Sequence, residues 1–199
     1  METPAVDAPR ALGLDVRGRI EIVEGAIRTF ASRGYRATTR EDIALELGIT
    51  VDEILSQFPS WPGLLLAVID RWNNHRLLAV QRAVGDRGTL EFMRELIEHN
   101  VREPGLMRLL VGVSSEAADP THPAAPYFRE RYQLFHELIE AGIQNDVDRG
   151  LAPTGLVPSI MADQLIALYE GLQLQAMLRP EMDLAASFNR AVKYLTQGW

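Results

Sequence analysis

Two consecutive helix-capping patterns, separated by one glycine, constrain the fold of this chain more than any other feature. Thr39 precedes Asp42 by three residues, and Thr50 precedes Glu53 by the same spacing. A hydroxyl followed three residues later by a carboxylate satisfies the free N–H groups at the start of a helix. Gly48 lies between the two patterns, at a position suited to ending the first helix and turning the chain. The sequence therefore predicts two short helices joined by a tight turn, the arrangement of a helix-turn-helix.

Apolar periodicity predicts a further helix on each side of this pair. The preceding helix is expected over residues 17–33, before Gly34, with an inner stripe formed by Ile20, Val23, Ile27 and Phe30. The following helix is expected to begin near Trp61, because proline at the next position is tolerated in a first turn. It is expected to end at Val84, before Gly85. A helix of that length connects the N-terminal helices to the rest of the chain.

The remaining residues also have helical periodicity, and no segment has a convincing strand pattern. Further helices are expected at residues 90–102, 104–117, 126–148, 159–178 and 184–196. The sequence thus predicts an all-α protein with about nine helices. It divides into a disordered arm at 1–16, a helix-turn-helix domain at 17–60 and a larger helical domain at 61–199.

Charge and composition restrict the class of function. The net charge is −7. The first 60 residues hold seven arginines and ten acidic residues, a net charge of −3, which disfavours non-specific coating of nucleic acid. The absence of cysteine excludes disulfides and thiolate metal sites, and fits the reducing cytoplasm, where we expect the protein to lie. With no signal peptide and no apolar run near the ~18 residues of a membrane span, no contact with a membrane is expected.

No constellation of side chains indicates catalysis. The sequence has no glycine-rich phosphate loop and no recognisable Ser-His-Asp arrangement, and its histidines lack metal-ligand spacing. Glu116, Asp119 and His122 are close in sequence, but a helix end and a proline turn separate them. We therefore expect a protein that is not an enzyme and holds no metal or cofactor. The alternative of a small helical enzyme requires His99, Glu116 and His136 to converge in the larger domain.

The N-terminal third resembles the TetR family of transcriptional regulators. The resemblance rests on Ala26, Phe30, Gly34-Tyr35, Ala37-Thr38-Thr39, Asp42-Ile43-Ala44, Leu47-Gly48-Ile49-Thr50, Ile54, Phe58-Pro59-Ser60 and Leu64-Leu65-Leu66. It implies a homodimer that binds a palindromic operator in double-stranded DNA, with the second helix of the helix-turn-helix in the major groove. It also implies that a small-molecule effector binds the larger domain and changes the spacing of the two DNA-binding heads, most often to relieve repression.

The DNA contacts implied by this resemblance lie on the two short helices and just before them. They are Arg36, Thr38, Thr39, Arg40, Thr50, Val51, Asp52, Glu53, Leu55, Ser56 and Gln57. Free N–H groups at the start of a helix bind phosphate, which favours contacts around the first of the two helices. Arg17 and Arg19 are expected to extend the contact from the N-terminal side.

The second short helix departs from the family pattern. Val51, Leu55 and Trp61 stand where the family usually has lysine, tyrosine and lysine, and phosphate contacts supply much of the affinity for DNA. Asp52 and Glu53 are first-turn acids that favour the helix dipole, although a carboxylate also accepts from cytosine N4 in the major groove. The alternative function is therefore the same fold with weakened or lost DNA binding, acting as a small-molecule or protein binding module.

Candidate effector and dimer contacts come from apolar periodicity in the larger domain. The candidate effector contacts are Met93, Ile97, Leu110, Val113, Tyr132, Phe135, His136 and Tyr169. Residues 159–178 are apolar nearly all round, which indicates burial on two sides. The family resemblance implies that the second side packs against a second copy. The candidate dimer contacts are Leu165, Leu168, Leu172, Phe188, Val192 and Leu195.

Overall fold

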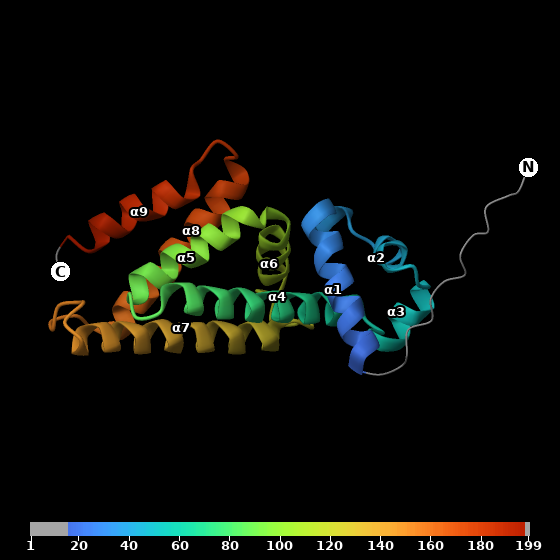
Figure 1. Cartoon of the computed structure of the whole chain (residues 1–199), viewed down its shortest axis with the longest axis horizontal. Helices are drawn as coiled ribbons and strands as arrows, with labels where there is room; N and C mark the ends of the chain where they lie inside the picture. The colour runs from blue at the N-terminus through green and yellow to red at the C-terminus, as the bar shows by residue number, and fades with distance from the viewer. Residues whose placement is uncertain (1–15, 198–199) are drawn as a thin grey trace, which may run out of the picture.

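The computed structural model describes residues 16–197, which form nine α-helices, one short 3-10 helix and no β-strand (Figure 1). In chain order these are α1 (Val16–Arg33), η1 (Tyr35–Ala37), α2 (Arg40–Leu47), α3 (Val51–Gln57), α4 (Trp61–Val84), α5 (Thr89–Arg102), α6 (Pro104–Glu116), α7 (Ala125–Asp148), α8 (Pro158–Leu178) and α9 (Leu184–Leu195). The all-α prediction is confirmed, with helix ends within a residue or two of those expected. The expected N-terminal arm, apart from its last residue, lies outside the described residues.

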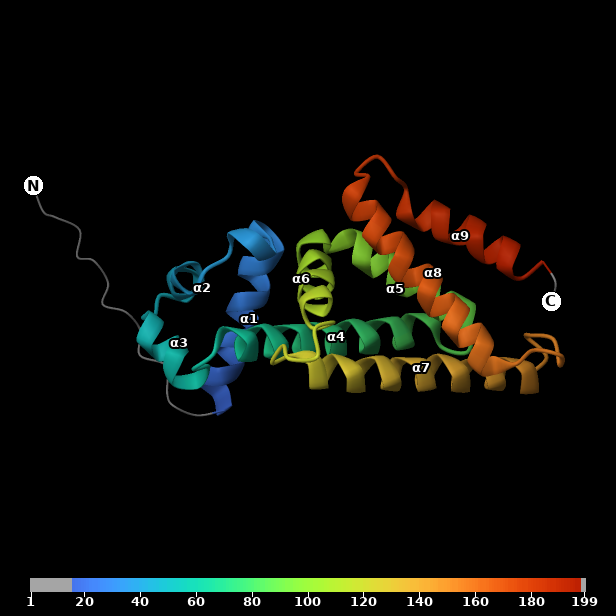
Figure 2. The same cartoon turned by 180° about the vertical axis from the view of Figure 1, so that it is seen from behind.

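The helices form a small head, made of α1, α2 and α3, at one end of a larger bundle. Both views show α4 running from the head along the bundle, with α7 beside it and α5, α8 and α9 stacked over the pair (Figures 1 and 2). Helix α6 crosses this direction and stands between the bundle and α1. None of the helices within residues 16–197 is both long and apolar enough to span a membrane.

Both predicted capping boxes are present in the head. The side chain of Thr39 caps α2 and that of Thr50 caps α3, each in a reciprocal pair with the carboxylate three residues later. Gly48 ends α2 with φ 66°, in the left-handed region that residues with a Cβ avoid. The local sequence therefore sets the beginning of both helices and the turn between them.

The expected inner stripe of α1 is partly wrong. Ile20 is 44% exposed, whereas Ile22 is fully buried beside Ala26 and Phe30. The buried face follows the small residues of α1, because α2 approaches the helix there: a Cβ at Gly25 would lie 2.6 Å from the side chain of Leu47. Periodicity alone did not distinguish this close helix contact from a face with larger side chains.

The apolar core consists of two clusters, and α4 contributes to both. One cluster joins the head to the first half of α4 and to α6, and includes Phe30, Ile54, Leu64 and Leu106. The other joins the second half of α4 to α5, α7, α8 and α9. The head is thus packed against the start of α4 and against α6, so a displacement of either helix acts on the head. The domain boundary near residue 60 stays a prediction.

Candidate functional site

Helix α3 presents a polar, acidic surface at the end of the head. Asp52, Leu55 and Ser56 are exposed, Val51 is half-buried, and Ile54 anchors the helix in the core. The carboxylate of Glu53 accepts from the backbone N–H of Thr50 at 2.8 Å and from its hydroxyl at 2.9 Å. The Ser56 hydroxyl donates to the carbonyl of Glu53 at 2.7 Å. The outward face of α3 therefore carries one exposed acid, Asp52, and one acid engaged in capping.

These two acids give a matched test of the capping argument. Glu53→Ala removes half of the capping box and should lower the free energy of unfolding by about 1 kcal/mol. Asp52→Ala removes a first-turn acid that makes no capping bond, and should cost less than half as much. Urea denaturation of the two variants measures the difference. Equal losses would mean that the box contributes nothing beyond the helix dipole.

Side chains at the start of α2 are largely occupied by contacts within the head. The N–H of Thr39 donates to Asp42 at 3.0 Å, and this hydrogen bond lowers the pKa of the Asp42 carboxyl. Arg33 forms an ion pair with the same carboxylate at 3.0 Å. Thr38 is buried and donates its hydroxyl to the carbonyl of Gly34 at 2.8 Å. Of the predicted threonine contacts, Thr39 and Thr50 are exposed and Thr38 is turned inward.

Two arginines near α3, Arg19 and Arg40, each lie against an aromatic ring. The Arg19 guanidinium lies 3.9 Å from the centre of the Phe58 ring and donates to the carbonyl of Gln57, so it holds the end of α3. The Arg40 guanidinium lies 5.1 Å from the centre of the Trp61 ring. Arg19 was predicted to contact DNA, and no local signal indicated a partner 38 residues away.

The contact between the head and α6 has both polar and close-packed parts. The Tyr35 hydroxyl donates toward both carboxylate oxygens of Glu116 at 3.2 Å, and Arg36 lies 3.6 Å from the same group. Burial, followed by the Glu116 charge, raises the pKa of Tyr35. A Cβ at Gly105 would lie 2.6 Å from the carbonyl oxygen of Phe30. Helix α6 therefore rests directly on α1 and η1, and cannot move without affecting them.

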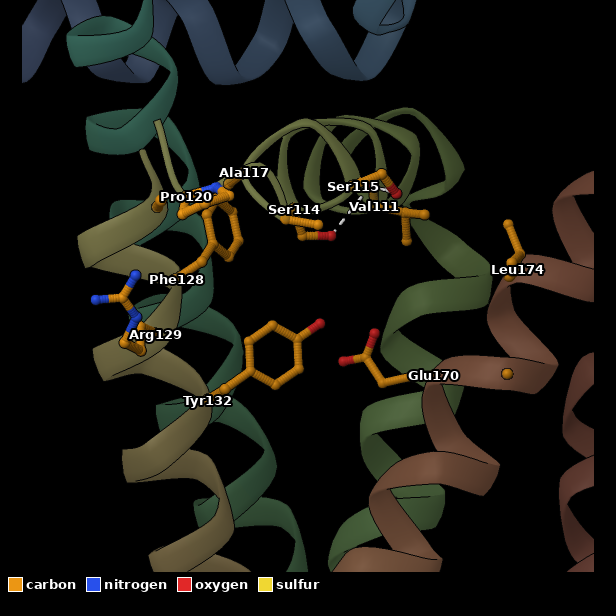
Figure 3. Close-up of a pocket in the computed structure, with 13 residues that line it drawn as sticks. Val111, Ser114, Ser115, Ala117, Pro120, Phe128, Arg129, Tyr132, Glu170 and Leu174 are labelled. Atoms are coloured by element: carbon orange, nitrogen blue, oxygen red, sulfur yellow. Dashed lines mark hydrogen bonds between the residues drawn. The ribbon is translucent and has the colours of Figure 1, made fainter. Parts of the chain in front are cut away.

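A cavity of about 590 Å³ opens on the other side of α6, between α7 and α8 (Figure 3). Figure 3 shows Tyr132 and Glu170 pointing toward each other across it, with Phe128 and Ser114 nearby. Burial raises the pKa of Glu170, and the Arg131 charge opposes that effect. The lining includes residues 111, 114, 115, 117 and 118, from the end of α6 and just beyond it. A molecule in this cavity would contact the helix that supports the head.

Two further cavities flank a buried polar cluster in the bundle. One of about 360 Å³ lies between α4 and α7, and Phe135 and Tyr169 are among its lining residues. The other, of about 620 Å³, lies among α5, α6, α8 and α9, with Asn100 and Gln173 in its lining. The Asn100 amide donates to the Tyr169 hydroxyl at 2.7 Å and to Gln173 at 2.6 Å, so the cluster reaches from one cavity to the other.

The predicted effector residues divide between these cavities and the core. Tyr132 lines the cavity of Figure 3, while Phe135 and Tyr169 line the one between α4 and α7. His136 lines none of these cavities and lies 3.1 Å from Asp163. The four aliphatic candidates are core residues that line none of them: Met93, Ile97, Leu110 and Val113. Within residues 16–197, no cluster of three or more histidine or acidic side chains could hold a metal ion.

Half of the predicted dimer contacts are turned inward. Leu165, Phe188 and Val192 are almost completely buried within the chain, so they have no surface left for a second copy. The half-buried candidates are Leu168, Leu172 and Leu195. The exposed row of α8 is formed by Ile160, Ala167, Gly171, Leu174 and Leu178, with the exposed polar residue Gln164 between the first two. Because α8 is apolar nearly all round, periodicity did not distinguish its inner face from its outer one.

Comparison with known proteins matches the head to one family. Residues 22–68 match the model for bacterial regulatory proteins of the tetR family. An uncharacterised HTH-type transcriptional regulator of Bacillus subtilis, YvkB, is 25% identical over 107 residues, which cover 48% of this chain and 57% of that protein. The matched segment thus spans little more than half of this curated relative.

Solved structures match nearly the whole chain at low identity. A TetR transcription regulator from Haloarcula marismortui has a TM-score of 0.78 and 18% identity, covering 92% of this chain and 98% of its own. A regulator from Saccharomonospora viridis in complex with choline has a TM-score of 0.75 and 20% identity, covering 92% and 97%. FadR from Bacillus subtilis, in complex with stearoyl-CoA, has a TM-score of 0.72 and 13% identity, covering 90% and 98%. At these identities the likeness establishes the fold.

Proposed function

Because this chain belongs to the TetR family of transcriptional regulators, we propose that it is a ligand-responsive repressor that binds a palindromic operator as a homodimer in the cytoplasm. The observation that carries the proposal is the helix-turn-helix, with both caps formed and α3 at the end of the head. Two such heads related by a two-fold axis read two half-sites of one operator. No catalytic role is part of this proposal.

In this proposal, side chains at the start of α2 contact the phosphates of the DNA backbone. Trp61 occupies a position where the family usually has a lysine, and it lies against the Arg40 guanidinium. In our proposal this contact directs Arg40 toward a phosphate and replaces the missing charge. Ser56 and Gln57 on α3 are the uncharged groups available for base edges, and Asp52 opposes binding unless it accepts from a cytosine.

The effector signal passes through α6. The cavity of Figure 3 lies against one side of this helix, while Tyr35 and the backbone of Phe30 contact it elsewhere. An effector that displaces the end of α6 therefore changes the position of the head in each subunit, and with it the spacing of the two reading helices. Two proteins of the same fold were solved in complex with choline and with stearoyl-CoA, which supports a function that responds to a ligand.

A second candidate function is a small-molecule or protein binding module that no longer binds DNA. One observation favours it: acids neutralise many of the head's arginines, with pairs at Arg17–Glu21, Arg28–Glu46, Arg33–Asp42 and Arg36–Glu116. These pairs are largely exposed, so each contributes little to stability and can be exchanged for a phosphate. Operator binding remains the better-supported function because the helix-turn-helix frame is complete.

A polarisation titration with DNA flanking the protein's own gene tests this function. We expect sequence-dependent binding whose affinity falls as salt rises. Arg40→Gln should weaken binding to all sequences and reduce the salt slope by about 1, as expected for one lost phosphate contact. Arg82→Gln, an exposed arginine on α4 distant from the head, is the matched control and should change neither. Equal, salt-insensitive affinity for unrelated DNA would support the second candidate instead.

A further inference from the structure

The cavity between α4 and α7 combines a cationic side with an apolar side. Two arginines line it, Arg76 from α4 and Arg131 from α7, together with Asn73 and the ring of Tyr169. The apolar side is formed by Leu77, Leu134, Phe135 and Leu138. Its volume of about 360 Å³ falls within the range of small-molecule sites. The cavity therefore has room for a small amphiphilic molecule.

Arg76 is a buried cation whose hydrogen-bond partners are all neutral. Only 5% of the residue is exposed. One terminal nitrogen donates to the Asn100 carbonyl oxygen and, at 3.5 Å, to the Tyr169 hydroxyl, and the other donates to the Asn73 carbonyl oxygen at 2.6 Å. Burial is the largest cause that lowers the pKa of Arg76. The guanidinium also lies 4.5 Å from the centre of the Trp72 ring. A buried charge with only neutral partners is energetically costly until a counter-ion reaches it.

Neither Arg76 nor Arg131 forms a direct ion pair with a carboxylate in the described part of the chain. Among residues 16–197, no carboxylate lies within 4.0 Å of the charged nitrogens of Arg76 or Arg131. Glu103 and Glu170 act on Arg76 only from beyond that distance, and Glu103 accepts from the Trp72 indole at 2.6 Å. The cationic side thus carries a positive charge that the protein does not neutralise by contact.

Three buried N–H groups of residues that line the cavity have no hydrogen-bond partner. They are Nδ2 of Asn73, Nε of Arg76 and Nη1 of Arg131. Buried donors in folded proteins are nearly always satisfied, so each unpaired donor requires an explanation. All three are donors, two belong to cations, and all belong to residues that line one cavity. An acceptor with negative charge satisfies this combination, whereas a cation does not.

We propose that the cavity between α4 and α7 is a binding site for a small organic carboxylate. Its carboxylate accepts from Asn73, Arg76 and Arg131, and its apolar body lies against Leu77 and Phe135. Asp70 and Glu130 also line this cavity, but both are exposed, so solvent screens their repulsion. This site differs from the cavity of Figure 3, whose lining includes both Glu170 and Arg129.

Binding here would act on the helix that leads into the head. Arg76 and Asn73 belong to α4, which begins at Trp61, directly after α3 and a short turn. Drawing α4 toward α7 through a shared carboxylate changes the angle at which α4 meets the head. This consequence for DNA rests on the proposed function, whereas the binding site itself does not.

Calorimetric titration of the full-length protein tests the site with three matched probes: octanoate, octanamide and octylamine. We expect octanoate to bind at least about tenfold more tightly than octanamide, and octylamine not to bind. Arg131→Gln should reduce octanoate affinity by about tenfold or more, because it removes one of the two cations. Arg82→Gln, the exposed arginine of α4, should leave octanoate binding unchanged. Circular dichroism of each variant verifies that the fold is retained.

The remaining outcomes separate this site from its rivals. Equal affinity for octanoate and octanamide, or stronger binding of octylamine, would overturn the proposal. A titration with inorganic phosphate tests the apolar half: phosphate binding as tightly as octanoate would contradict a site built for an organic anion. Phe135→Ala should weaken octanoate and leave any phosphate binding unchanged. The experiment measures the heat of ligand binding. It therefore tests the site even if the protein does not bind DNA.

Discussion

Ala167→Glu is expected to convert the proposed dimer into a monomer. Ala167 lies in the middle of the exposed row of α8, beside Gly171, and small residues there allow the α8 helices of two copies to approach closely. A glutamate at this position adds bulk and buries a charge in each half of a symmetric contact, so the cost is incurred twice. Light scattering after gel filtration should give the mass of one chain, 22.2 kDa, in place of twice that value.

The same variant should lose operator binding by about 100-fold or more, since each head then binds its half-site without help from its partner. Ala83→Glu, on an exposed position of α4, is the matched control and should stay dimeric. A dimer that survives Ala167→Glu would move the interface away from this face of α8. A monomer that still binds the full operator tightly would contradict the proposed two-headed reading.

Gly105→Ala should separate α6 from α1 and uncouple the bundle from the head. The new Cβ would lie 2.6 Å from the carbonyl oxygen of Phe30 and 2.8 Å from that of Ala31. These carbonyl groups belong to the last turn of α1, and backbone atoms cannot rotate away as a side chain can, so α6 itself has to shift. We expect the free energy of unfolding to fall by about 1–2 kcal/mol, because the cost of overpacking exceeds the gain in helix propensity. The midpoint temperature of thermal unfolding should fall by about 2–4 °C for each kcal/mol of stability lost.

Gly112→Ala is the control for this substitution, on the same helix and against the same part of the head. Its Cβ would lie 2.9 Å from the ring of Tyr35, a side chain that can rotate away. We expect a smaller loss of stability than for Gly105→Ala, and a partial loss of effector response. If the two variants have the same stability, the close approach at Gly105 is not what positions α6.

Local patterns predicted the elements of this fold well. Capping pairs at Thr39 and Thr50 and glycines such as Gly48 and Gly85 act within a few residues, so helix ends were readable from the sequence. The inner face of α1 was not, because Ile20 and Ile22 are equally apolar and only the approach of α2 selects one of them. Contacts between distant segments, such as Arg19 on the end of α3, have no local signature.

The candidate sites were predicted less well, for a physical reason. A cavity forms where packed side chains fail to fill space, and the apolar periodicity that identified Met93 and Ile97 marks the positions that fill it best. The polar cluster around Arg76 and Asn73 interrupts that periodicity on α4 and was not recognised. A buried arginine inside an apolar helix face is the signal that could have indicated it.

Selection of binding sites from a random pool of double-stranded DNA tests the central claim most directly, because it assumes nothing about where the operator lies. The purified full-length protein should enrich an inverted repeat, with half-sites at the separation of the two α3 helices in the dimer. Ala167→Glu should fail to enrich it under the same conditions. Recovery of no sequence above background, or of a motif without two-fold symmetry, would contradict a dimeric operator-binding regulator.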